Sequence, residues 1–193
     1  MNPLDDIRTP RLILRHMSGE VMAACLRGEL GRAERVLGIR IPAELLDRPT
    51  SLQYGLARWA DDCRYEPWSM RAVVLPRESA MIGHIRFHSS PDPEYLRRYA
   101  PGAVEFGYCI FRDYRRHGYA TEAAMAVMEW AQESFGVRHF IASVSPGNHP
   151  SLRLIGRLGF VHVGTELDDT DGVEHVFLRV ASAPASAGGS SPA

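Results

Sequence analysis

The segment from residue 105 to residue 124 constrains the fold of this chain more than any other. It begins as an apolar, strand-like run, passes through Arg115, Arg116 and Gly118, and turns directly into an alanine-rich stretch with helical spacing. The first N–H groups of a helix have no partner within it, and the helix dipole places positive charge there. This strand-to-helix turn therefore predicts a backbone site for an anion such as a diphosphate.

Other phosphate-binding sequences are absent from the chain. It contains no Gly-x-x-x-x-Gly-Lys-Ser/Thr sequence, and no Gly-x-Gly-x-x-Gly follows a predicted strand. The predicted anion site is thus neither a Walker loop nor a dinucleotide-binding loop.

Length and composition predict one ordinary globular domain. The chain has 193 residues, of which 45% are hydrophobic and 23% charged, enough for a substantial core. Its net charge of −1 gives no reason to expect a nucleic-acid partner.

Several further classes of protein are disfavoured. No run of about 18 apolar residues is present, and the acidic N-terminus lacks an apolar signal core, so we expect no membrane partner. Cys25, Cys63 and Cys109 are odd in number and widely spaced, which suits neither a disulfide framework nor a metal site. We therefore expect a cytoplasmic protein without a bound metal.

The hydrophobic periodicity alternates between strands and helices, which predicts a mixed α/β layer fold. Strands are expected at residues 8–16, 70–75, 81–87, 104–110, 137–144, 160–165 and 173–180. Helices are expected at residues 18–26, 30–46 with a break, 50–62, from the 115–120 turn to about residue 134, and 148–158. Residues 181–193 contain only Ala, Ser, Gly and Pro, which predicts a disordered tail after a domain of residues 8–180.

Turn and cap residues refine these boundaries. Ser18 suits an N-cap, as does Thr50 or Ser51, and Gly136 is expected to stop its helix. Residues 89–102 are rich in Pro, Arg and Tyr and predict a long excursion of the kind that is often functional. Asp-Gly within residues 168–172 predicts a hairpin.

Two motifs together resemble the GNAT (GCN5-related N-acetyltransferase) superfamily. Residues 115–120, Arg-Arg-His-Gly-Tyr-Ala, match the family signature Gln/Arg-x-x-Gly-x-Gly/Ala. Residues 148–160 look like the family's Asn-x-x-Ser/Ala segment that ends in Leu-Gly-Phe, and residues 9–15 resemble the ribosomal-protein N-terminal acetyltransferase (RimJ/RimL-like) branch. The physical chemistry agrees, because Gly118 lets the backbone approach a diphosphate without an intervening Cβ.

This resemblance implies a single-domain GNAT fold of the α/β (α+β) class. The implied sheet is mixed, mostly antiparallel and six- to seven-stranded, with about four flanking helices. Its two central parallel strands, residues 104–110 and 137–144, would splay apart around a thioester.

The resemblance also implies acetyl-CoA as the co-substrate, with its diphosphate on the N–H groups of residues 116–121. Asn148 would bond the pantetheine arm, although asparagine is equally suited to a plain N-cap. The coenzyme-binding residues implied are Tyr108, Cys109, Ile110, Arg115, Arg116, His117, Gly118, Tyr119, Ala120, Thr121, Asn148 and Ser151.

Glu105 is the first candidate for the general base, because similar enzymes often carry a glutamate on this strand. Burial would raise the pKa of its carboxyl toward neutrality, which suits a base. His84 and His88 are the alternatives, together with water, and both share strand parity with Arg86.

Ser151 is the second candidate catalytic residue, since the resemblance places it near the thioester sulfur. Many family members carry a tyrosine acid four residues later, where this chain has Ile155. The role of general acid would then pass to Ser151, to water, or to no residue if the thiolate leaves unaided. Cys109 could act as an acyl nucleophile, but a small buried cysteine is the more common role on a strand.

The leading hypothesis is an N-acetyltransferase that moves an acetyl group from acetyl-CoA to a primary amine by direct attack. The acceptor is either a protein N-terminal α-amine or a small-molecule amine, and family precedent leaves a homodimer open. Glu166, Asp168, Asp169 and Asp171 either attract a cationic amine or form a solvated hairpin tip. The alternative is a non-catalytic acyl-CoA-binding sensor of the same fold.

Overall fold

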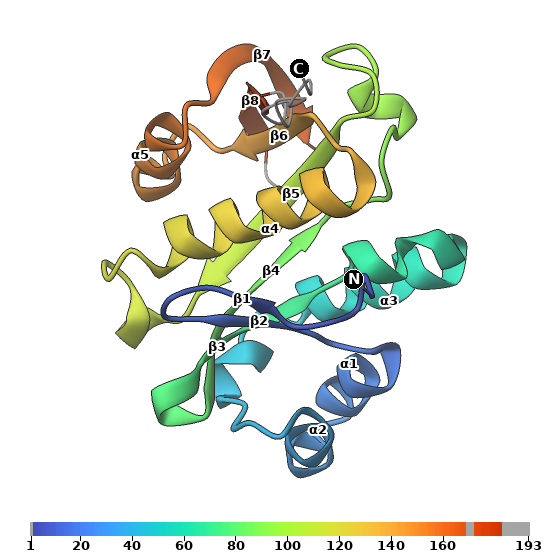
Figure 1. Cartoon of the computed structure of the whole chain (residues 1–193), viewed down its shortest axis with the longest axis vertical. Coiled ribbons are helices and arrows are strands. Elements are labelled where there is room, and N and C mark those ends of the chain that lie inside the picture. The colour runs from blue at the N-terminus through green and yellow to red at the C-terminus, as the bar shows by residue number, and fades with distance from the viewer. Residues whose placement is uncertain (1, 169–171, 183–193) are drawn as a thin grey trace, which may run out of the picture.

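The computed structural model describes residues 2–168 and 172–182, and shows one eight-stranded sheet with helices on both faces (Figure 1). The strand order is β1-β2-β3-β4-β5-β6-β8-β7. The strands are β1 (Ile7–Arg8), β2 (Ile13–His16), β3 (Arg71–Leu75), β4 (Ala80–Phe87), β5 (Val104–Ile110), β6 (His139–Val144), β7 (Val161–Asp168) and β8 (Gly172–Val180). The α-helices are α1 (Gly19–Leu26), α2 (Leu30–Leu37), α3 (Thr50–Asp61), α4 (Tyr119–Phe135) and α5 (His149–Arg157).

The predicted mixed, mostly antiparallel sheet is confirmed, with slightly more strands than expected. The stretch 8–16 divides into β1 and β2, because a tight turn closes between them. In that turn the Thr9 N–H donates to the Leu12 carbonyl, and Pro10 has no N–H to offer a ladder. Short 3₁₀ turns also form, including η1 (Ala43–Leu46), η2 (Cys63–Trp68), η3 (Pro76–Glu78), η4 (Glu94–Leu96) and η5 (Arg112–Tyr114).

The sheet separates two hydrophobic cores. On β3, Val73 and Leu75 pack in the core with α4, while Ala72 and Val74 pack in the core with α1 and α2. Successive strand residues point to opposite faces, so a strand covered on both faces is buried throughout. This explains why residues 72–75 form an uninterrupted apolar run.

Most predicted helix ends are confirmed. The Ser18 hydroxyl accepts the Val21 N–H at the start of α1, and Gly136 ends α4 with φ +70°. The expectation that Thr50 or Ser51 caps α3 is wrong. The helix begins at Thr50 and its N-cap residue is Pro49, with no side-chain cap bond. The predicted 30–46 helix is broken at Gly38, which takes φ +67°.

The β7–β8 hairpin forms as predicted, with Asp168 opposite Gly172. Its tip, residues 169–171, lies outside the described residues, as does the predicted tail beyond Ser182. No helix among residues 2–168 and 172–182 combines the length and the apolar character needed to cross a membrane.

Candidate functional site

The site forms where β5 and β6 diverge. These strands run parallel but pair only at Val104–Phe140 and Glu105–Ile141. Beyond this point β5 pairs with β4 alone and β6 with β8 alone, which leaves a wedge that opens toward the C-terminal ends of both strands. The predicted splay of the two central parallel strands is therefore confirmed.

The wedge exposes main-chain groups of β5. The His88 N–H bonds the Glu105 carbonyl and the Phe111 N–H bonds the Ile82 carbonyl, so odd-numbered residues of β5 bond β4. The N–H groups of Tyr108 and Ile110 consequently point toward the wedge. Cys109 was expected to contribute here, but its backbone faces β4 opposite His84.

A backbone anion site follows directly after β5. Arg116 has φ +65° and Gly118 has φ +80°, and this alternation turns successive N–H groups toward one side. Among the described residues, no acceptor bonds the N–H groups of residues 116–121. A Cβ on Gly118 would meet only the end of the Arg11 side chain, at 3.4 Å, so the space above the turn is open.

Side chains around this turn fix its position. Arg11 Nη1 donates to the His117 carbonyl at 2.9 Å, and its guanidinium lies 4.8 Å from the Tyr119 ring centroid. Glu122 in the first turn of α4 accepts from Arg11 and Thr9. Sequence reasoning did not assign Arg11 to the site, since only the tertiary structure brings the N-terminal segment to the start of α4.

The second motif meets β5 across the mouth of the wedge. The hydroxyl groups of Tyr108 and Ser151 lie 3.0 Å apart and share a hydrogen bond. Burial raises the pKa of the Tyr108 phenol, and the bond to Ser151 opposes that shift. Ile155, at the position of the family tyrosine, is buried in the core.

Asn148 caps helix α5. Its Oδ1 accepts the Ser151 N–H at 3.2 Å, as the N-cap interpretation predicts. The residue is exposed at the end of the wedge, where its amide N–H₂ group is free of this bond.

Glu105 is 6% exposed and lies on the face of β5 opposite α4. Its carboxylate accepts hydrogen bonds from Tyr95, at 3.0 Å, and from Ser143, and lies 3.4 Å from His88 Nδ1. Burial raises the pKa of this carboxyl, but His88, Ser143 and Tyr95 together outweigh it and lower the pKa to about 2. The expectation of a pKa near neutrality is wrong, because three donors stabilise the ionised form.

The two candidate histidines differ sharply. His88 is partly exposed and its Nδ1 faces Glu105, while its Nε2 lies over Gly107, where a Cβ would approach to 2.7 Å. Burial and Arg86 lower the pKa of His84 to about 4, and its buried Nδ1 has no hydrogen-bond partner in the part of the chain that the structure describes. The structure therefore joins His88, and not His84, to Glu105.

Cys109 is unsuited to nucleophilic attack. Burial raises the pKa of its thiol, which keeps it protonated. This agrees with a packing role.

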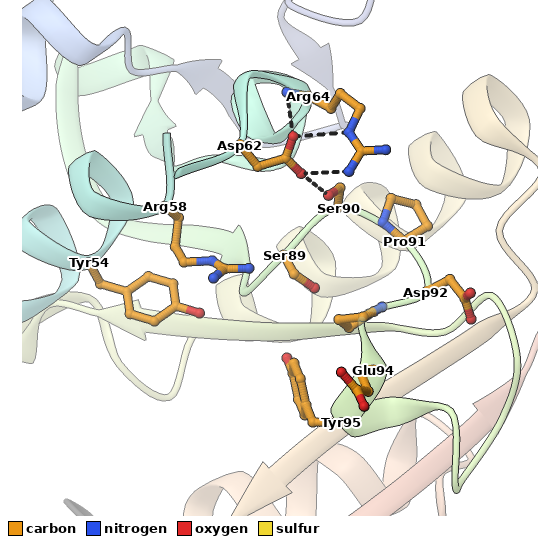
Figure 2. A pocket seen from close by; sticks show the side chains of 11 residues that line it. Tyr54, Arg58, Asp62, Arg64, Ser89, Ser90, Pro91, Asp92, Glu94 and Tyr95 are labelled. Carbon is orange, nitrogen blue, oxygen red and sulfur yellow. Dashed lines mark hydrogen bonds and ion pairs between the residues drawn. The ribbon is translucent and has the colours of Figure 1, made fainter. Parts of the chain in front are cut away.

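A cavity of about 540 Å³ opens on the α3 side of this polar face (Figure 2). Tyr54, Arg58, Ser89 and Tyr95 line it, together with residues of the 89–95 segment. Tyr54 donates to the His88 carbonyl at 2.7 Å and Tyr95 donates to Glu105, so the cavity adjoins the Glu105–His88 pair. The predicted excursion at residues 89–102 thus forms one wall of a cavity.

The acidic hairpin contributes less charge than its sequence indicates. Glu166 is bound by Arg98 and by the Tyr99 hydroxyl, so its charge is compensated. Asp169 and Asp171 lie outside the described residues.

Comparison with known proteins identifies a family and a curated relative of part of the chain. The family profile described as "Acetyltransferase (GNAT) domain" matches residues 11–161. An uncharacterized N-acetyltransferase of Bacillus subtilis, YnaD, is 30% identical over 92 residues, which are 48% of this chain and 49% of that protein. The chain thus matches about half the length of this curated relative.

Solved structures share the fold. One is an acetyltransferase from Salmonella typhimurium that modifies the N-terminal serine of ribosomal protein L7/L12, with a TM-score of 0.62, 14% identity and coverage of 92% of this chain and 100% of that one. Another is the microcin C7 self-immunity acetyltransferase MccE in complex with acetyl-CoA and AMP, with a TM-score of 0.59, 11% identity and coverage of 90% and 94%.

Proposed function

The chain belongs to the GNAT acetyltransferase family, and from that premise we propose that it transfers an acetyl group from acetyl-CoA to a primary amine. The observation that carries this proposal is the wedge between β5 and β6, flanked after β5 by N–H groups that no described residue bonds and after β6 by Ser151. The MccE structure, solved with acetyl-CoA, supports the choice of donor.

The residues at the wedge fit an extended thioester donor. The N–H groups of residues 116–121 would bind its diphosphate, with Arg115, Arg116 and His117 nearby. Asn148 and Ser151 would bind the pantetheine arm, and the N–H groups of Tyr108 and Ile110 would polarise the thioester carbonyl. The donor supplies an acyl group activated as a thioester, so the protein needs mainly to position and polarise.

We assign activation of the acceptor to Glu105 and His88 together. An ionised Glu105 at pKa about 2 is too weak a base to take a proton from an amine directly. It would instead hold Nδ1–H of His88 and leave Nε2 to accept the amine proton, directly or through water. In this role Glu105 is a positioning residue.

We assign protonation of the leaving thiolate to the Tyr108–Ser151 pair. Ser151 was the expected candidate, and the 3.0 Å contact adds Tyr108 to it. A phenol with a raised pKa remains protonated at neutral pH and can donate its proton as sulfur leaves.

Release of free coenzyme A thiol from acetyl-CoA tests the proposal when it is measured with a panel of primary amines. The panel should include short peptides with free N-termini, polyamines and amino acids. Turnover above the rate without amine is the expected result. Acetyl-CoA binding without thiol release for any amine would favour a non-catalytic sensor, and absence of binding would refute the donor assignment.

A further inference from the structure

Two guanidinium groups that lack an anionic partner lie at the cavity on the α3 side: Arg58 lines the cavity, and Arg86 contacts the ring of Tyr54, which also lines it. Arg58 projects from α3 into the cavity beside Tyr54, toward Ser89 (Figure 2). Arg86 on β4 stacks on Tyr54, with its Cζ 4.1 Å from the ring centroid. Within the part of the chain that the structure describes, neither group has a carboxylate within 4 Å.

The aspartates on this face are paired. Asp62 binds Arg64 at 3.0 Å and also accepts from the Ser90 hydroxyl, as Figure 2 shows. Asp92 binds Arg97 at 3.1 Å. Glu94 is an exposed carboxylate on η4 at the cavity wall.

Among the described residues, one nitrogen of each of these arginines is buried without a hydrogen-bond partner. These atoms are Arg58 Nε and Arg86 Nη1. A buried charged donor that makes no hydrogen bond costs free energy, and an anion bound close to the same guanidinium would offset part of that cost by its charge. A guanidinium is also suited to bidentate binding of carboxylate or phosphate.

The two arginines lie close to His88, which we propose accepts the proton of the amine. Tyr54 contacts Arg86 on its ring face and donates to the His88 carbonyl. Arg86 and His88 lie on the same face of β4, opposite Gly107 and Glu105 of β5. An acceptor in this cavity therefore lies beside the guanidinium of Arg58 and next to Tyr54 and Tyr95, the two tyrosines that bond His88 and Glu105.

We propose that the acceptor is a small primary amine that carries a carboxylate or phosphate group. Arg58 and Arg86 bind the anionic group, while the amine faces His88 and Glu105. This rests on the proposed acetyltransferase function and narrows its substrate class to amino acids or aminoalkyl phosphates. Amines without an anionic group leave both guanidinium groups unpaired.

Matched acceptors test the proposal in the thiol-release assay. Amino acids are compared with their α-carboxamides, and O-phosphoethanolamine with ethanolamine, so that the two pairs distinguish carboxylate from phosphate. We expect kcat/KM to be at least about 10-fold higher for the anionic member of one pair. Equal rates, or faster turnover of peptides and polyamines, would overturn the proposal while leaving the acetyltransferase function intact.

Variants test whether the two arginines cause the preference for anionic acceptors. Arg58→Gln and Arg86→Gln should each remove most of the preference with little change for the neutral amines, and Arg58→Lys should restore part of it. Arg35→Gln, an exposed arginine on α2, is the matched control. Equal losses for anionic and neutral amines would contradict a role in recognition.

A binding measurement keeps the inference testable if no amine is turned over. N-acetylated amino acids and their amides are titrated calorimetrically into the protein in the presence of coenzyme A, and O-phosphoethanolamine and ethanolamine into the protein alone. Tighter binding of an anionic compound than of its neutral partner, lost in Arg58→Gln, would support the anion site. Equal binding, or binding of none of these compounds, would refute it.

Discussion

The backbone turn at residues 116–121 and the polar face of β4 and β5 use different chemical groups of the protein. The turn uses main-chain N–H groups, while the side chains of Arg116 and His117 are exposed. The polar face uses side chains around the buried Glu105, which is held by donors from three separate segments. The turn depends on backbone conformation, whereas the polar face depends on tertiary packing. Removing a side chain should therefore have little effect on the turn and a large effect on the polar face.

The largest expected effect comes from a side chain added to the backbone turn. Gly118→Trp places bulk over the N–H groups of residues 116–121 and should weaken coenzyme A binding about 1000-fold, or about 4 kcal/mol. Calorimetric titration measures this change. Gly136→Trp is the control, because Gly136 has a similar φ of +70° with no atom within 4 Å of its ideal Cβ. Equal coenzyme A affinity in both variants would show that the diphosphate does not bind at this turn.

A buried polar side chain gives the next largest effect. Glu105→Gln keeps the shape but removes the charge that orients His88, and should lower kcat about 100-fold with little change in acetyl-CoA binding. Steady-state kinetics and calorimetry separate the two quantities. Wild-type turnover in this variant would exclude Glu105 from amine activation.

A smaller effect is expected at the mouth of the wedge. Tyr108→Phe removes the hydroxyl that contacts Ser151 and should lower kcat about 10-fold, because water can replace the proton donor. The effect should shrink in a Ser151→Ala background, since the two hydroxyl groups act as one pair. Additive losses would mean that they act independently.

The smallest effect is expected for an exposed side chain on the turn. His117→Ala leaves the backbone N–H groups in place, so coenzyme A affinity should change less than about 3-fold. The same titration checks this value. A loss as large as that of Gly118→Trp would show that side chains, and not the main chain, carry the anion site.

Much of the fold could be predicted from the sequence because its signals are local. Helix α4, strand β5 and the turn between them follow from the spacing of apolar residues and from Gly118 and Gly136. The start of α3 was less predictable, since Thr50 and Ser51 are both good caps and the structure uses neither. The count of strands was low because the Thr9–Leu12 turn interrupts a short apolar run.

The candidate site was predictable only in part. Glu105 and Ser151 could be picked out by position, but not the environment that lowers the pKa of Glu105 or the contact of Ser151 with Tyr108. Arg58 and Arg11 gave no local signal that separates them from the chain's many other arginines, whereas Arg86 stood out only by its strand parity with His84 and His88.

By itself the sequence determined the order of the elements, the wedge-forming strands and the backbone turn, because backbone conformation depends on near neighbours. Only the tertiary structure decided which donors surround Glu105, which histidine it holds and which arginines remain unpaired. Those properties depend on contacts between distant segments of the chain. Burial strengthens the effect of each contact on the protonation state and pKa of the buried group.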